Sequence, residues 1–249
     1  PKFKGTIEQT LPYEGISTDS KTRVSGNADL RAAAFGNNLF MAGGANGTIL
    51  TSDNGVDWES QSSITGGASV QGLVYGNGGF MAATGSKESN GNGGSLAFMS
   101  DEGNTWEPET VEGLAELNYL DVAFGNETFI APSKEGQVAI IGKSSGSADV
   151  KPVSTKELRA AAFGDGLFIV AGVQGEVYSS TNGANWTDIS SGKFNFKKLL
   201  DQQQSGKNSI DKIFDGTKGD LNKLSINFNA VTFGEGKHII AGSGGAIFY

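Results

Sequence analysis

The chain has 249 residues, a formal net charge of −8, 38 glycines and no cysteine. This length suits one large all-β domain, and the lack of cysteine excludes disulfides and thiolate metal sites. The acidic balance argues against nonspecific nucleic-acid binding, and no apolar run is long enough to span a membrane.

One seven-residue phrase recurs five times along the chain. Each copy is mostly apolar and ends in an aromatic residue followed by glycine. The copies are residues 30–36, 70–76, 119–125, 158–164 and 228–234. Each leads into a second apolar run, a glycine-containing turn and a third run. Short strands that repeat at spacings of about 40 residues predict the blades of a β-propeller.

The blades follow one another in chain order. The first has predicted strands at residues 31–35, 39–42 and 48–52, with a fourth that begins near Trp58. Asn46-Gly47 predicts a tight turn between its second and third strands. We expect one domain, residues 1–249, with this division: blades at about 30–62, 70–110, 117–155, 158–190 and 226–249 plus 1–10, and an insertion at 191–225.

The fifth blade ends early. Its third strand, residues 246–249, has no successor, whereas residues 3–9 read as a short strand. We expect the two to pair and close the ring, because closure hides exposed sheet edges. The predicted fold is therefore all-β: a five-bladed β-propeller of four-stranded antiparallel blades, closed by the N-terminal strand, with a small helical insertion near 193–224.

Three blades continue into a similar turn, at residues 51–58, 99–106 and 179–186. These turns resemble the Asp-box (BNR) repeat of sialidase-like propellers, roughly Ser/Thr-x-Asp-x-Gly-x-Thr-Trp, although Thr181 replaces the third aspartate. The resemblance implies a structural role. Aspartate would accept backbone N–H bonds, glycine would allow positive φ, and tryptophan would fill the gap between sheets. The residues concerned are Asp53, Gly55, Trp58, Asp101, Gly103, Trp106, Gly183 and Trp186.

Three long non-repeated segments, 10–29, 87–94 and 191–225, join strand ends on one face of the predicted propeller. Long loops on a rigid scaffold commonly carry binding sites. Segment 191–225 is rich in lysine and has apolar residues at helical spacing, which predicts two short amphipathic helices. The partner-docking candidates in it are Lys193, Lys197, Lys198, Lys207 and Lys212. The alternative is that these helices only pack on the propeller.

The inner strand of each blade begins on that same face, near the axis. Polar residues gather at these strand starts, and such a ring can hold a carboxylate or sugar hydroxyls. Alternatively, they hydrogen-bond to loop backbone and order the insertions. The ligand-binding candidates are Arg31, Gln71, Tyr119, Asp121, Arg159 and Asn229.

Catalysis finds little support in these residues. Glycoside hydrolysis needs two carboxylates that face one bond, and only Asp121 lies near the axis. Sialidases use three arginines, a Tyr–Glu pair and an aspartate; Tyr119 and Asp121 keep a hydrolase as an alternative. His238 is the only histidine and lies on a predicted strand, where we expect a packed or surface residue. We therefore expect no enzymatic activity, no cofactor and no metal site.

These observations predict a non-enzymatic binding or assembly module. We expect a structural or decoration component of a large particle such as a phage virion, with capsid or tail proteins as partners. A lectin-like module that binds glycans or a receptor is the alternative. We expect no nucleic-acid binding and no membrane insertion. The expected location is a virion or extracellular particle surface or, if the chain is not phage-derived, a soluble protein made in the cytoplasm without a signal peptide.

Overall fold

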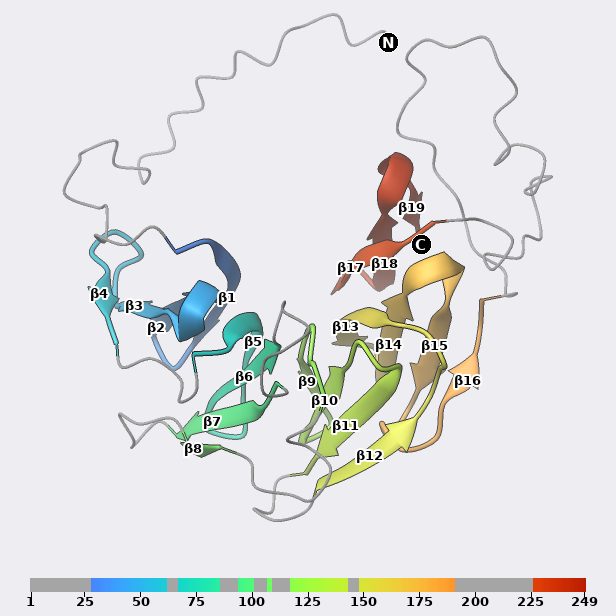
Figure 1. Ribbon diagram of the computed structural model, residues 1–249, viewed down its shortest axis with the longest axis horizontal. Helices are drawn as coiled ribbons and strands as arrows, with labels where there is room; N and C mark the ends of the chain where they lie inside the picture. Colours follow the sequence, from blue (N-terminus) through green and yellow to red (C-terminus); the bar gives the residue numbers. More distant parts are fainter. Residues whose placement is uncertain are drawn as a thin grey trace, which may run out of the picture.

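The computed structural model describes residues 28–61, 67–85, 94–100, 107–108, 117–142, 148–190 and 226–249. Their strands form five small antiparallel sheets arranged in a ring about a common axis (Figure 1). The predicted five-bladed β-propeller is confirmed. The closing strand expected at 3–9 and the helical insertion expected near 193–224 lie outside the described residues. Within the described ranges, no helix is long and apolar enough to cross a membrane.

The five sheets follow the chain in order. Blade 1 comprises β1 (Leu30–Gly36), β2 (Leu39–Gly44), β3 (Ile49–Ser52) and β4 (Glu59–Ser60). Blade 2 comprises β5 (Ser69–Gly76), β6 (Gly79–Gly85), β7 (Leu96–Ser100) and β8 (Glu107–Pro108). Blade 3 comprises β9 (Ala123–Gly125), β10 (Thr128–Pro132), β11 (Gln137–Ile141) and β12 (Ala148–Pro152). Blade 4 comprises β13 (Leu158–Gly164), β14 (Leu167–Gly172), β15 (Val177–Ser180) and β16 (Thr187–Asp188). Blade 5 comprises β17 (Phe228–Gly234), β18 (Lys237–Gly242) and β19 (Ile247–Phe248).

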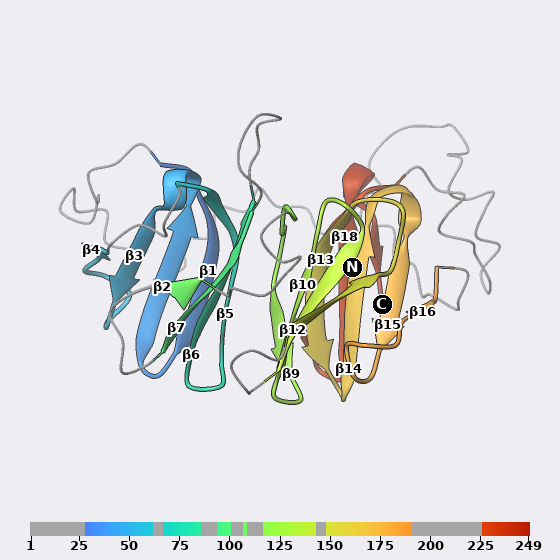
Figure 2. The same ribbon diagram turned by 60° about the horizontal axis from the view of Figure 1, so that its bottom comes forward.

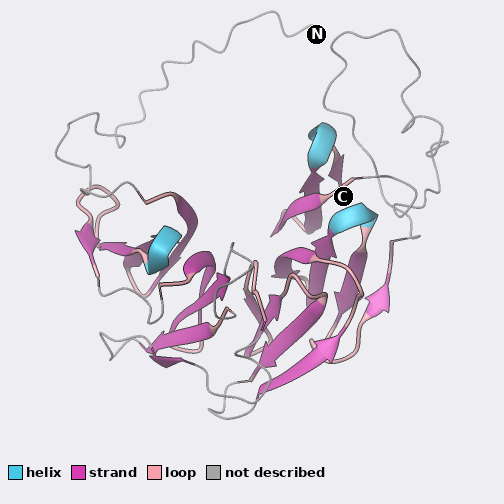
Figure 3. Ribbon diagram, viewed as in Figure 1, coloured by secondary structure: helices cyan, strands magenta, loops and turns pink. Residues whose placement is uncertain are grey.

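In the part of the chain that the structure describes, three blades carry a short 3-10 turn between their second and third strands (Figure 3): η2 (Ala45–Gly47), η3 (Val173–Gly175) and η5 (Ser243–Gly245). In blade 1, Asn46 and Gly47 both have positive φ, as the predicted tight turn requires. The backbone N–H of the first residue of each turn donates to the carbonyl of the residue just before the inner strand of the same blade. Ala45 N, for example, lies 2.9 Å from Asp29 O. These turns and the inner-strand starts therefore share one end of the molecule, which we call the mouth face.

The opposite end carries the turns between the first and second strands of each blade (Figure 2). These turns also bond to neighbouring blades. The Asn77 Nδ2 donates to Glu127 O at 3.1 Å, and the Asn126 Nδ2 donates to Thr181 O at 3.3 Å. Because Thr181 follows the third strand of blade 4, the Asp-box-like turn of that blade lies at this end, away from the mouth face.

The repeated phrase sets the spacing between blades. A Cβ built on Gly36 would fall 1.9 Å from the Tyr75 ring of the next blade, so only glycine fits there. The same contact recurs with closest approaches of 2.0–2.4 Å at Gly76–Phe124, Gly125–Phe163 and Gly164–Phe233. We call these four pairs the glycine–aromatic contacts. Each lays the aromatic residue of one inner strand on the glycine that ends the preceding inner strand.

The hydrophobic core lies between the blades. Blades 1 and 2, for example, share a cluster in which Met41 and Ile49 pack with Phe80, and all three side chains are almost fully buried. Three similar clusters join blades 2 and 3, 3 and 4, and 4 and 5. The apolar faces of neighbouring sheets therefore hold the ring together, as expected for a propeller without disulfides.

Candidate functional site

Four of the five inner strands carry a β-bulge near the mouth face. The pairing register of β1 shifts between Leu30 and Ala32, and β5, β13 and β17 shift at the matching place. A bulge leaves one residue out of the ladder and re-aims its side chain. The bulged residues are four of the predicted candidates: Arg31, Gln71, Arg159 and Asn229.

Arg159 joins two blades. Its Nε pairs with Glu157 Oε1 at 2.9 Å, and its Nη1 donates to Asn229 Oδ1 of blade 5 at 2.9 Å. The structure therefore brings two predicted candidates together. Glu157 was not predicted, although an acidic residue two places before the arginine, as in Asp29 before Arg31, could have indicated it.

Arg31 occupies the same place in blade 1, but its surroundings differ from those of Arg159. Asp29 is exposed and, in the part of the chain that the structure describes, forms no ion pair with Arg31. The Arg31 Nη1 is buried and donates no hydrogen bond to any described residue. Gln71, at the equivalent place in blade 2, is half-buried and forms no hydrogen bond to Arg31. Among the described residues, Arg31 therefore lacks the partners that Arg159 has.

Asp121 links blades 3 and 4. Its Oδ1 accepts from Val122 N at 2.8 Å and its Oδ2 accepts from Ala161 N at 2.9 Å. Burial raises the pKa of Asp121 to about 6, and the two N–H bonds partly offset that rise. A Cβ on Gly72 would lie 2.8 Å from the Asp121 backbone, so blade 2 also approaches this residue closely.

Tyr119 belongs to the core. Its side chain is fully buried in the cluster between blades 2 and 3. Burial and the negative charge of Glu135 raise the pKa of the phenol, which keeps it protonated at neutral pH. Glu135 itself accepts from the Asn118 backbone N at 3.0 Å and from Asn118 Nδ2 at 2.9 Å. This placement does not favour Tyr119 as a nucleophile.

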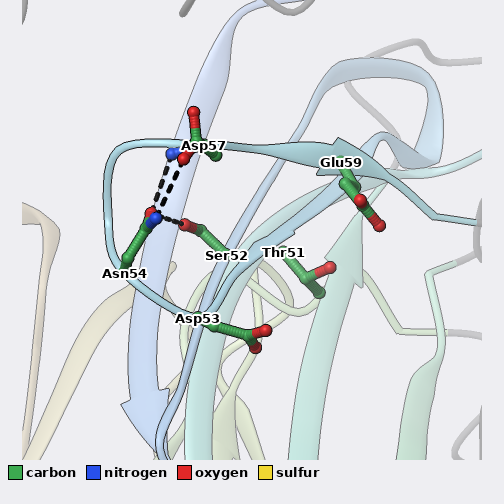
Figure 4. Close-up of a pocket in the computed structure, with 6 residues that line it drawn as sticks. All are labelled: Thr51, Ser52, Asp53, Asn54, Asp57 and Glu59. Carbon is green, nitrogen blue, oxygen red and sulfur yellow. Dashed lines mark hydrogen bonds between the residues drawn. The ribbon is translucent and has the colours of Figure 1, made fainter.

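The Asp-box-like turn of blade 1 is closed by an asparagine. Asn54 Oδ1 accepts from Val56 N and Asp57 N, both at 2.8 Å. Figure 4 draws the hydrogen bonds that join Asn54 to Asp57 and to Ser52. The expectation that Asp53 would accept these bonds is wrong. Asp53 is exposed, and the side-chain oxygen of Asn54 is the acceptor instead. The turn of blade 4 repeats the arrangement, with Asn182 Oδ1 accepting from Ala184 N and Asn185 N.

The glycines and tryptophans of these two turns have structural contacts. Gly55 and Gly183 have φ of +73° and +72°, and their carbonyls accept from the indole N–H of Trp58 and Trp186. Trp186 also packs in the cluster between blades 3 and 4. The remaining Asp-box-like turn, that of blade 2, falls on Asp101, Gly103 and Trp106, which lie outside the described residues.

A hollow of about 160 Å³ adjoins the blade 1 turn. Figure 4 shows its six lining residues: Thr51, Ser52, Asp53, Asn54, Asp57 and Glu59. Its asparagine and serine are already engaged, since Ser52 Oγ accepts from Gly55 N at 2.9 Å and Asn54 holds the turn. No group of three or more His, Cys, Asp or Glu side chains in the described ranges could hold a metal ion.

His238 takes the place of an aromatic residue. It pairs with Phe233 at a ring-centroid distance of 4.8 Å, where blade 4 pairs Phe168 with Phe163 at 4.6 Å. Burial lowers the pKa of His238, and a hydrogen bond to the Leu167 backbone partly offsets this. The docking candidates Lys193, Lys197, Lys198, Lys207 and Lys212 lie outside the described residues.

The fold is similar to solved β-propellers. YCF48 from Cyanidioschyzon merolae matches with a TM-score of 0.56 and 14% identity over 91% of this chain and 70% of that one. The computationally designed Ika8 protein matches with a TM-score of 0.53 and 14% identity over 88% of this chain and 70% of that one. No protein-family model matches the sequence, and no curated protein is similar to it. These likenesses concern the fold, because one fold can serve many unrelated functions.

The raised pKa of Asp121 gives a pH-dependent prediction. The folded state holds this proton more tightly than the unfolded chain, so the contribution of Asp121 to stability is greatest at low pH and falls as the pH rises from about 4 to about 6. Asp121→Asn removes that dependence. The difference in unfolding free energy, wild type minus variant, should fall by on the order of 2 kcal/mol across this window.

Urea unfolding of both proteins at several pH values measures this difference, and Asp165→Asn, at the opposite end of the molecule, is the matched control. A constant difference between wild type and Asp121→Asn would contradict the assignment of a buried, poorly solvated carboxylate.

Proposed function

We propose that this protein is a non-catalytic binding and assembly module that docks to a partner protein through its mouth face. The observation that carries the proposal is the use of polar groups near the axis to join blades. Both oxygens of Asp121 are engaged by backbone N–H groups, and Arg159 is held by Glu157 and Asn229. A hydrolase needs a pair of carboxylates free to face one bond.

The connections support the mouth face as the docking surface. The β6–β7 connection leaves at Gly85 and returns at Gly94, and both glycines approach backbone carbonyls of residues 117–119 near the start of the blade 3 inner strand. The β16–β17 connection returns at Ile226, whose carbonyl accepts from Gly175 N in η3 at 2.8 Å. Long connections held by a rigid scaffold are common binding elements.

In its finer form, the proposal is a structural or decoration component of a large particle such as a phage virion, with capsid or tail proteins as partners. The apolar core between blades and the polar groups that join blades at the mouth both favour a rigid scaffold, which suits a structural component. The acidic chain, with its net charge of −8, favours solubility over nonspecific adhesion to nucleic acid.

Site-specific photocross-linking in the producing cell tests the docking face. Gln174 and Asp165 are both exposed, both have positive φ and both belong to turns of blade 4, but they lie at opposite ends. A benzophenone side chain at Gln174 should cross-link to partner proteins at several times the yield of one at Asp165. Equal yields, or cross-links only from Asp165, would contradict docking through the mouth face.

Turnover of a sialoside or arabinoside that Asp121→Asn abolishes would contradict the absence of catalysis.

A second candidate function is glycan binding at the mouth, and the partnerless Arg31 Nη1 favours it. A guanidinium nitrogen without an acceptor among the described residues suits the carboxylate of an acidic sugar. On an array of acidic and neutral glycans, this function predicts binding that falls at least tenfold in Arg31→Ala. Arg159→Ala is the control, because Arg159 is already paired. The absence of binding, or equal losses in both variants, would exclude it.

A further inference from the structure

Blade 1 exposes a face that the other blades bury. Leu30, Phe35 and Phe40 lie on its side away from blade 2 and are 51%, 57% and 36% exposed. In blade 5, His238 stands at the place of Phe40 and is half-buried. All the other residues at the places of Leu30 and Phe40 in blades 2 to 5 are at most 2% exposed. They are Val70, Tyr119, Leu158, Phe228, Phe80, Phe129 and Phe168. Each of those blades packs this face against its predecessor, and blade 1 has no packed predecessor among the described residues.

Blade 5 exposes the complementary face. Gly234 ends its inner strand, as Gly164 ends that of blade 4, yet a Cβ on Gly234 would meet nothing within 4 Å. Gly164 carries the Phe233 ring, whereas Gly234 carries none and is exposed. The turn η5 is exposed as well, although the equivalent glycines Gly47 of η2 and Gly175 of η3 are buried.

The two faces are the halves of one contact. Blade 1 has an aromatic residue without a glycine, and blade 5 has a glycine without an aromatic residue. We infer that the ring closes between blades 5 and 1 of the same molecule by a fifth glycine–aromatic contact, with Phe35 seated on Gly234. We call this junction the seam. The inference does not depend on the proposed docking function.

Closure within one molecule fits the geometry better than a second copy does. Blades 1 and 5 end the series and lie on either side of the opening in the ring (Figure 1), so rotations shared among the four existing contacts would bring them together. Those contacts are mainly apolar and therefore non-directional, which permits such tilting.

The seam would also complete the mouth. The Arg159 side chain of blade 4 already reaches Asn229 of blade 5. Closure makes blade 1 the next neighbour of blade 5, which places Arg31 beside Asn229 in the ring. The open seam therefore separates the two mouth residues that closure would bring together, and seam closure and mouth geometry are coupled.

Pulsed electron–electron spin resonance tests the seam directly. The chain has no cysteine, so pairs of introduced cysteines can carry spin labels without background. Asn37 and Glu235 flank the seam, whereas Asp165 and Glu235 flank the contact already made between blades 4 and 5. All three are exposed, have positive φ and follow the glycine of their inner strand, so the two labelled pairs are matched.

We expect the Asn37–Glu235 pair to show a population as short as that of the Asp165–Glu235 pair. Gly234→Leu should remove this population without harming the fold, because nothing lies near that position in the open form. Phe35→Ala should weaken it, and neither change should alter the Asp165–Glu235 distance. Dilution with unlabelled protein should leave the short distance unchanged.

Three results would overturn the inference. One is a wild-type seam that shows only long distances. Another is a short distance that survives in both Gly234→Leu and Phe35→Ala. The last is a short distance that dilution with unlabelled protein removes, which would assign the two faces to contacts between copies.

Discussion

The close approach of an aromatic ring to a glycine is the constraint on which the rest of this structure depends. At each of four junctions, the ring of one inner strand occupies the space that a Cβ would take on the preceding inner strand. The contact fixes how closely neighbouring sheets approach, and the apolar clusters between blades form around it. A propeller without disulfides therefore gains its order from packing repeated at a fixed place in each blade.

The mouth follows from the same architecture. Inner strands that converge on an axis leave one backbone edge without a neighbouring strand, and polar side chains satisfy part of that edge. Asp121 accepts from Ala161 N of the next blade, and Arg159 spans to Asn229. The inner strand of blade 3 is shorter than the others, since β9 begins only at Ala123. The polar groups of the mouth thus mainly join blades, and among the described residues the Arg31 Nη1 has no hydrogen-bond partner.

The fold could be predicted from the sequence because the patterns that indicate it are local and repeated. The phrase that ends in Phe35-Gly36 predicted the inner strands, and Asn46-Gly47 predicted a turn that the structure contains. What it could not supply depends on three-dimensional neighbours. Nothing in the sequence marks the bulge at Arg31, nor the partnership of Arg159 with an asparagine 70 positions away. The choice of Asn54 over Asp53 as the turn acceptor depends on backbone direction, which motif spacing does not encode.

A double-mutant cycle on one glycine–aromatic contact tests the central claim most directly. Gly125→Ala, Phe163→Ala and the double variant are unfolded in urea and compared with wild type. Because a methyl group on Gly125 would fall 2.0 Å from the Phe163 ring, the glycine substitution should be costly only while that ring is present. We predict that the loss of unfolding free energy in the double variant is smaller than the sum of the losses in the two single variants by about 1–3 kcal/mol. Strict additivity would show that the ring and the glycine do not depend on each other, and would contradict the account.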